Sequence, residues 1–304
     1  MAFLQYELWK DCSNGCKYCF NQYVPKKRNK LNALEYAINS LKSKNLEAGS
    51  SIGFMGGEFF GGQLSNKKVK EKFYELSNLV IEKLNTNPPG RFLIMSALMA
   101  DDNSDWLEFC DFIHKNNFDS NMLICTSWDS LYRFTDRTKK NWEETMKITQ
   151  EKYPEMKIHV EMILTEYLIQ NIMKNPNYLK DFEKQWNVRV DFNIPYLPLL
   201  YELHNEPKEK FIERLPDFLP KRKSFLTLLK ERPDSFDLAG ISDHRFHSSE
   251  LHYSLNDIDW IVLPERDKME TTCINHKVCD NCCGYADSNI KIQKDIKMFL
   301  QSCL

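Results

Sequence analysis

Three cysteines near the amino terminus are spaced to bind an iron–sulfur cluster. Cys12, Cys16 and Cys19 form a C-x3-C-x2-C pattern, and Gly15 allows the loop between them to wrap closely. A cluster of four irons normally takes four thiolates, so three cysteines leave one iron open to a substrate or cofactor. Zinc or incidental thiols are the alternatives, but zinc usually needs a fourth Cys or His, and no His lies near residues 12–19.

A Gly-Gly-Glu sequence follows the next apolar segment. Gly56, Gly57 and Glu58 come directly after residues 51–55, SIGFM, which are typical of a short buried strand. Alone, this tripeptide fits an ordinary turn. Together with the cysteines, and with Tyr18 immediately before the third of them, it resembles the signature of the radical S-adenosylmethionine (SAM) family.

The resemblance implies a reaction and a set of ligands. In that family the amine and carboxylate of SAM chelate the open iron of a 4Fe–4S cluster, and an electron from the cluster cleaves SAM. The products are methionine and a 5'-deoxyadenosyl radical, which abstracts hydrogen from a substrate. By this resemblance the three cysteines bind the cluster, and the cofactor-binding residues include Tyr18, Gly56, Gly57 and Glu58.

Weaker elements of the same resemblance lie further along the chain. Ser127 and Asp129 match a Ser-x-Asp element, Arg137 fits the region after it, and Ser96 ends a predicted strand. Each implies a contact with SAM, whereas ordinary helix caps and turn residues are the alternative. The family's Gly-rich motif is missing from the fifth predicted strand, KIHVEMILT, so the adenine contacts are not predicted. No catalytic side chain is assigned.

Alternating strands and helices must position these residues. Apolar patterns predict strands over 3–9, 51–55, 91–99, 121–127, 157–165 and 188–194. Between the first five of these strands they predict helices over 31–44, 66–85, 104–117 and 139–152, and one final helix precedes the last strand. This order requires a parallel sheet, and the resemblance implies a partial (β/α)6 TIM-like barrel over residues 1–195. Ligands of such folds collect at the carboxyl ends of the strands, where the motifs lie.

Residues 196–304 form a small cysteine-rich C-terminal extension in this interpretation. It resembles a shortened SPASM or twitch extension, which implies one auxiliary iron–sulfur cluster. We favour four ligands, with Cys283 as a substitute, namely Cys273, Cys279, Cys282 and Cys303. The alternatives are a thiol pair used directly in chemistry and a zinc site in which His276 replaces Cys303.

Other potential metal ligands have simpler interpretations. Cys110 and Cys125 are predicted to be core residues, because a free cysteine packs as a small hydrophobe. His244, His247 and His252 share no clean helix face, which favours surface or structural roles.

Composition indicates an ordinary globular chain. Apolar residues make up 42% of the 304 residues and the formal net charge is −2, so no global field favours a polyanion. The sequence shows neither a run of eighteen apolar residues nor a signal peptide. We therefore expect a cytoplasmic protein that does not associate with a membrane. Ten cysteines in such a chain favour metal or redox chemistry over disulfides.

The predicted function is reductive cleavage of SAM followed by hydrogen abstraction. The extension favours a peptide or protein substrate, although no separate leader-binding module is expected. A nucleotide, a nucleic-acid base or another small metabolite is the alternative substrate, and aromatic residues such as Tyr196, Tyr201 and Phe225 would stack on a base. The required partner is an external one-electron donor such as flavodoxin or ferredoxin. A non-catalytic metal-binding scaffold is the alternative from another class.

Overall fold

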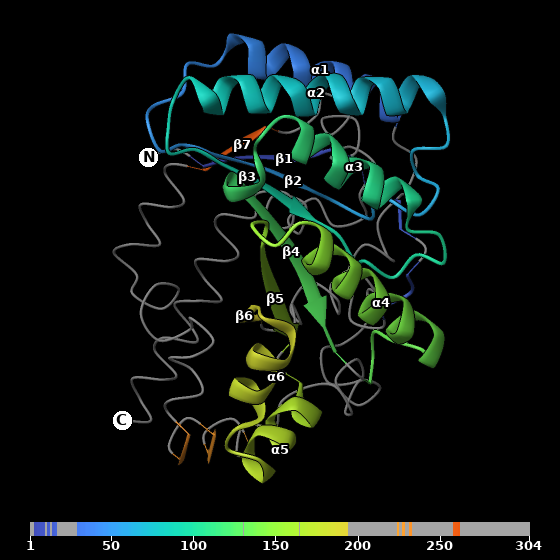
Figure 1. Ribbon diagram of the computed structural model, residues 1–304, viewed down its shortest axis with the longest axis vertical. Helices are drawn as coiled ribbons and strands as arrows, with labels where there is room; N and C mark the ends of the chain where they lie inside the picture. The colour runs from blue at the N-terminus through green and yellow to red at the C-terminus, as the bar shows by residue number, and fades with distance from the viewer. Residues whose placement is uncertain are drawn as a thin grey trace, which may run out of the picture. The chain divides into compact units, whose positions relative to one another are not determined.

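The computed structural model describes residues 3–9, 11–12, 14–16, 29–129, 131–163, 165–193, 224, 227–228, 231–232 and 258–261. Its strands are β1 (Phe3–Glu7), β2 (Ser51–Met55), β3 (Arg91–Met95), β4 (Met122–Trp128), β5 (Lys157–Ile163), β6 (Arg189–Asn193) and β7 (Ile258–Ile261). Its α-helices are α1 (Lys30–Ser43), α2 (Lys67–Asn85), α3 (Ser104–Lys115), α4 (Asp136–Lys152), α5 (Glu166–Lys174) and α6 (Tyr178–Trp186), and a short 3-10 helix, η2, spans Asp119–Asn121. The predicted alternation of strands and helices is therefore present (Figure 1).

These elements belong to two compact units. The first contains β1 to β4, α1 to α4, the start of β5, and β7. The second contains the rest of β5, followed by α5, α6 and β6. Within the described ranges, no helix is both long and apolar enough to cross a lipid bilayer.

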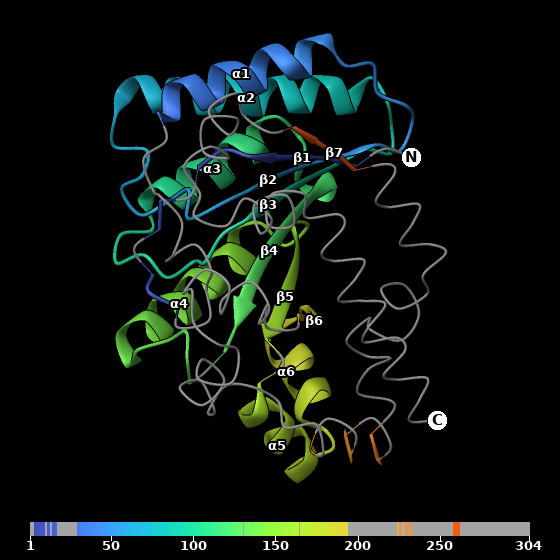
Figure 2. The ribbon, with the colours of Figure 1, turned by 180° about the vertical axis from the view of Figure 1, so that it is seen from behind.

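The sheet of the first unit is parallel. Its strands lie in the order β7-β1-β2-β3-β4, with Leu4 opposite Ile52 and Ile94 opposite Ile124 in the register. Parallel neighbours require a crossover connection, which α1, α2 and α3 provide along the chain from β1 to β4. The helices α2, α3 and α4 lie on one face of these strands, and Figure 2 shows the sheet from its other side.

Strand β7 was not predicted from the sequence. It pairs with β1, from Phe3 opposite Ile258 to Tyr6 opposite Ile261, and so extends the sheet beyond the first strand. The four residues IDWI are too short to stand out as a periodic signal among the charged and Pro-containing segments after residue 195. The domain boundary at residue 195 stays a prediction.

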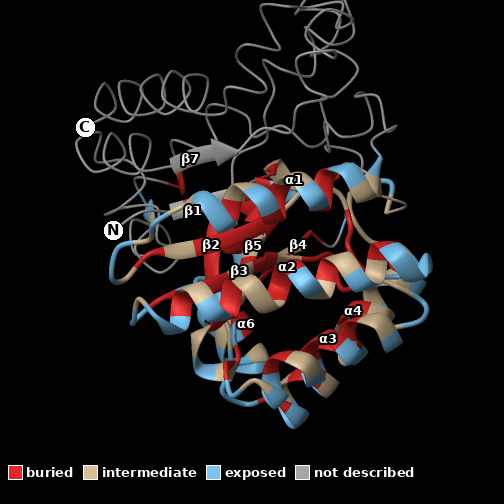
Figure 3. Cartoon of the chain, turned by 90° about the horizontal axis from the view of Figure 1, so that it is seen from above, coloured by how far each residue is buried: buried red, intermediate tan, exposed pale blue. Residues whose placement is uncertain are grey.

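An aromatic core joins the sheet to its helices. Phe54 of β2 and Phe92 of β3 have ring centroids 4.8 Å apart, and Phe73 of α2 lies 5.9 Å from Phe54. Phe109 of α3 lies 5.7 Å from Phe73, so rings from four elements form one buried cluster. Figure 3 shows the buried residues of α2 and α3 on their inner faces. This packing fixes the strands, whose carboxyl ends carry the predicted motifs.

Polar caps fix where the helices begin. The side chains of Asn29 and Asn66 accept backbone hydrogen bonds at the start of α1 and α2, respectively. Thr135 and Thr138 form a reciprocal capping box at the start of α4. In the second unit, two helices replace the single one predicted, because Pro176 lies between α5 and α6 and cannot continue a helix.

Candidate functional site

The predicted motifs of the first unit lie at one edge of its sheet. Cys12 and Cys16 follow β1, Gly56 to Glu58 follow β2, Ser96 follows β3, and Asp129 follows β4. Because these strands are parallel, their carboxyl ends meet at the same edge. The topology thus gathers segments that are far apart in sequence.

Main-chain contacts hold the Gly-Gly-Glu turn against Trp9 and Asp11, which lie just before the first cysteine. The amide of Gly57 donates to the carbonyl oxygen of Trp9 at 2.7 Å, and the amide of Glu58 donates to that of Asp11 at 2.9 Å. Gly56 has φ +146°, and a Cβ atom built there would lie 2.0 Å from the Trp9 oxygen. Glycine at this position therefore permits a close approach that any side chain would prevent.

Side chains reinforce the same junction. The indole Nε1 of Trp9 donates to the carbonyl oxygen of Glu58 at 2.8 Å, and its ring lies 5.0 Å from that of Phe59. Lys30, at the start of α1, pairs with Asp11 at 3.5 Å and lies 5.1 Å from the centre of the Trp9 ring. The chain entering the first cysteine is thus held by β2 and α1. Neither Trp9 nor Lys30 was predicted as part of the site.

The carboxylate of Glu58 connects the ends of β2 and β3. Its Oε1 accepts from the amides of Phe59 and Phe60 at 2.9 and 3.1 Å and from the Ser96 hydroxyl at 2.9 Å, while Oε2 accepts from the Ala97 amide at 2.6 Å. Burial raises the pKa of Glu58, and the four donors oppose that rise in part. These contacts give Glu58 a structural role, while its predicted contact with SAM stays a prediction.

Ser96 is part of the same network. Ser96 is 6% exposed, its O–H donates to Glu58, and its hydroxyl oxygen accepts from the Leu98 amide at 3.2 Å. The Ser96 amide donates to the carbonyl oxygen of Cys125 at 3.0 Å, which links the end of β3 to the middle of β4. The Ser96 hydroxyl therefore already donates one hydrogen bond and accepts another within the protein. A contact with SAM, as predicted, would be additional to these two bonds.

Asp129 is a different kind of carboxylate. It is 5% exposed, and its Oδ1 accepts from the amides of Leu131 and Tyr132 at 2.8 and 3.1 Å. Its Oδ2 is buried and has no hydrogen-bond partner among the described residues. Burial raises the pKa of Asp129, whereas the two amides and the positive charge of Arg133 lower it. Ser127, on β4 itself, is half-buried.

An arginine that was not predicted as a site residue reaches the cysteine loop. Arg133 Nη1 donates to Cys16 Sγ at 3.6 Å. By contrast, the predicted residue Arg137 is 75% exposed and pairs with Asp101 at 3.2 Å. A sequence signal existed, because Arg133 is the basic residue of the short connection between β4 and α4. Arg137 belongs to the first turn of α4 instead.

The described cysteines have two environments. Cys12 is half-buried and Cys16 is buried, both in the loop after β1. Cys110 and Cys125 are buried within α3 and β4, which confirms their prediction as core residues, and burial raises the pKa of the Cys110 thiol. Several predicted residues lie outside the described residues, namely Tyr18, Cys19, His244, His247, His252, Cys273, His276, Cys279, Cys282, Cys283 and Cys303.

The described half of the cysteine loop fits an iron–sulfur cluster. Two thiols share one short loop, a guanidinium donates to one of them, and Gly56 leaves room for the Trp9 carbonyl group just before the loop. Thiolate sulfur is the ligand that such clusters take. Within the described ranges, no three His, Cys, Asp or Glu side chains form a complete metal site, and the third predicted cysteine is outside those ranges.

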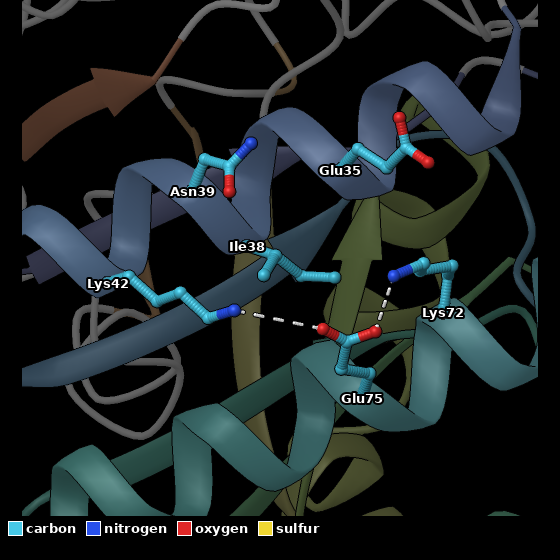
Figure 4. Close-up of a pocket in the computed structure, with 6 residues that line it drawn as sticks. All are labelled: Glu35, Ile38, Asn39, Lys42, Lys72 and Glu75. Atoms are coloured by element: carbon cyan, nitrogen blue, oxygen red, sulfur yellow. Dashed lines mark hydrogen bonds and ion pairs between the residues drawn. The ribbon is translucent and has the colours of Figure 1, made fainter.

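A surface pocket between α1 and α2 is not a candidate functional site. It encloses about 250 Å³ and contains Glu75, which pairs with Lys72 at 2.7 Å and with Lys42 at 3.9 Å (Figure 4). The remaining lining residues are Glu35, Ile38 and Asn39. The charged groups joined in Figure 4 bind one another, and none of them was predicted to act on a ligand. The candidate site therefore remains the edge formed by the carboxyl ends of the strands.

Neither a family model nor a curated protein matches the chain. Solved structures do. Native anSMEcpe with bound AdoMet and a Cp18Cys peptide aligns with a TM-score of 0.53 and 18% identity, over 82% of this chain and 66% of that one. Histidine-tagged anSMEcpe with bound AdoMet gives 0.53 and 18%, over 83% and 66%. Native anSMEcpe with bound AdoMet gives 0.52 and 19%, over 82% and 66%.

These neighbours are anaerobic sulfatase-maturating enzymes of the radical SAM superfamily, and AdoMet is SAM. The chain spans 66% of their length, and the low identity limits the likeness to the architecture. That architecture is the predicted one. The chain has the α/β fold of the partial (β/α)6 TIM-like barrels.

Proposed function

We propose that this chain is a radical SAM enzyme. The observation that carries the proposal is the main-chain junction between the entry to the cysteine loop and the Gly-Gly-Glu turn, where Gly57 and Glu58 donate to Trp9 and Asp11. Both segments occupy strand ends of a fold shared with structures that hold AdoMet. Fold alone does not establish function, so the proposal depends on the residues at this edge.

The residues have distinct roles in this proposal. Cys12, Cys16 and Cys19 would hold a 4Fe–4S cluster through their thiolates. When bound, the cluster supplies an electron that splits SAM into methionine and a 5'-deoxyadenosyl radical, which takes hydrogen from the substrate. Asp129 offers a buried carboxylate oxygen, Oδ2, as acceptor for a hydroxyl or ammonium group of SAM. Glu58 and Ser96 hold the strand ends in place.

The proposed substrate is a peptide or protein. One structural neighbour binds a Cp18Cys peptide together with AdoMet, which supports this class over nucleotides or other metabolites. The electron would come from an external donor such as flavodoxin or ferredoxin. The C-terminal cysteines, Cys273, Cys279, Cys282 and Cys303, would bind one auxiliary cluster.

The test is anaerobic reconstitution with iron and sulfide, followed by addition of dithionite and SAM. Wild type should bind about four irons per cluster and form 5'-deoxyadenosine. Cys16→Ala should lose one cluster and form no 5'-deoxyadenosine above the enzyme-free background. Cys110→Ala is the matched control, because Cys110 is a buried core cysteine of α3 and should leave both readouts intact.

The outcomes separate the competing functions. A wild-type chain with a full cluster but no cleavage of SAM would favour the metal-binding scaffold. Activity that survives Cys16→Ala would contradict the ligand assignment. If two clusters form, wild type should hold about eight irons and Cys16→Ala about four. Stimulation by nucleosides rather than by cysteine-containing peptides would overturn the substrate proposal.

A further inference from the structure

The connection between β4 and α4 presents a fixed positive charge to the cysteine loop. Arg133 Nη1 lies 3.6 Å from Cys16 Sγ, within the range of a hydrogen bond to sulfur. In the metal-free chain this sulfur stands in for the thiolate that would bind iron. The guanidinium is half-buried and stays protonated at all accessible pH values. The positive charge beside Cys16 is therefore present at every accessible pH.

The backbone on both sides of Arg133 is anchored. On its amino side, Asp129 Oδ1 accepts from the amides of Leu131 and Tyr132. On its carboxyl side, Phe134 packs against Trp128 with ring centroids 5.1 Å apart. The capping box of α4 begins at the next residue. These anchors fix the backbone position of Arg133 independently of the cysteine.

The charges around Arg133 favour this arrangement. Asp129 is close enough for the arginine to lower its pKa, although burial has the larger and opposite effect. The carboxylate in turn favours the cation at this place. A buried or half-buried cation beside a thiolate acts more strongly than in water, because the local dielectric is low.

We propose that Arg133 is a positioning residue that tunes the cluster by donating a hydrogen bond to the Cys16 thiolate. This inference rests on the proposed function. Reduction adds negative charge to a cluster, and a donor and positive charge at a ligand sulfur stabilise the reduced form. Arg133 thus makes the one-electron reduction by the external donor more favourable.

The experiment is an EPR-monitored potentiometric titration of the reconstituted chain without SAM. We expect Arg133→Gln to hold as much iron as wild type but to show a roughly tenfold lower ratio of reduced to oxidised cluster at the wild-type midpoint. This corresponds to a shift of about 59 mV to more negative potential for one electron. Arg133→Lys keeps the charge but loses the planar fork, so it should shift in the same direction by less.

Arg91→Gln is the matched control, because Arg91 is exposed at the start of β3, the opposite end of the strand from the site. Arg91→Gln should show the same midpoint potential as wild type. If Arg133→Gln also titrates with wild type, the inference is overturned even though the cluster is present. It is equally overturned if Arg133→Gln changes only the affinity for SAM, because the guanidinium would then act by contacting SAM and not through the Cys16 sulfur. A wild-type chain that binds no iron would instead overturn the proposed function.

Discussion

Two buried carboxylates stand at the strand ends of the first unit, and their surroundings differ. Glu58, after β2, has both oxygens occupied by four protein donors. Asp129, after β4, has one oxygen occupied and the other without a partner among the described residues. Both are about 5% exposed, so burial alone does not distinguish them.

The difference separates a structural role from a binding role. A carboxylate surrounded by donors of its own chain holds the fold together, and a ligand would have to displace one of those bonds. A buried carboxylate with an unpartnered oxygen is instead costly in the free protein, and a ligand that donates to it relieves that cost. The comparison therefore assigns a structural role to Glu58 and a ligand-binding role to Asp129.

The largest expected effect is that of Glu58→Gln. If the Gln oxygen keeps the contacts with Phe59, Phe60 and Ser96, its NH2 faces the Ala97 amide N–H, which cannot accept a hydrogen bond; in the reverse orientation the NH2 faces the amides of Phe59 and Phe60. We expect the free energy of unfolding to fall by roughly 3–4 kcal/mol, since buried donors lose their acceptor. Urea unfolding of the metal-free chain measures this. A loss below about 1 kcal/mol would contradict the structural role.

Gly56→Ala should have the second largest effect. The new Cβ would lie 2.0 Å from the Trp9 carbonyl oxygen, at a φ of +146° that side chains rarely adopt. We expect a loss of roughly 2–3 kcal/mol and reduced iron uptake, because the cysteine loop must move away from β2. Gly62→Ala is the control, since Gly62 has φ +87° but open space around it. It should lose less stability and bind iron normally.

Asp129→Asn should have the smallest effect on stability. The amide oxygen can still accept from Leu131 and Tyr132, and its NH2 replaces an oxygen without a described partner. We expect a change within about 1 kcal/mol but weaker binding of SAM to the reconstituted chain, measured by equilibrium dialysis. Unchanged SAM affinity would remove Asp129 from the proposed binding site.

The pH dependence of the unfolding free energy provides a further test of the environment of Asp129. Burial raises the pKa of Asp129, so its carboxyl contributes fully to stability below the unfolded-state value of about 3.9. That contribution is lost as the pH rises through the raised folded-state value. Asp129→Asn has no such titration, so its unfolding free energy should decline less than that of wild type as the pH rises above about 4. If the unfolding free energies of wild type and Asp129→Asn changed in parallel with pH, the pH dependence would not come from Asp129.

Periodic segments were the predictable part of this molecule. The strands β1 to β6 and helices α1 to α4 lie within a few residues of their expected positions, because apolar spacing and caps such as Thr135 determine them locally. Strand β7 has only four residues, and its pairing with β1 is a tertiary event without a local signal.

Motif positions were predictable, whereas the direction of individual side chains was not. The sequence indicates that Glu58 follows a strand, but not that four donors from the segments after β2 and β3 surround it. Arg133 and Arg137 are equally basic and four residues apart. Only the fold decides that the first lies against Cys16 and the second at the surface beside Asp101.

The hydrogen bonds from Gly57 and Glu58 to Trp9 and Asp11 have a consequence for how the cofactor is acquired. They join main-chain atoms and involve no sulfur, so Trp9 and Asp11, just before Cys12, are ordered by folding itself. The conformational entropy of these two residues is lost before any metal arrives. Such preorganisation strengthens metal affinity and lets iron find its first ligand already in place.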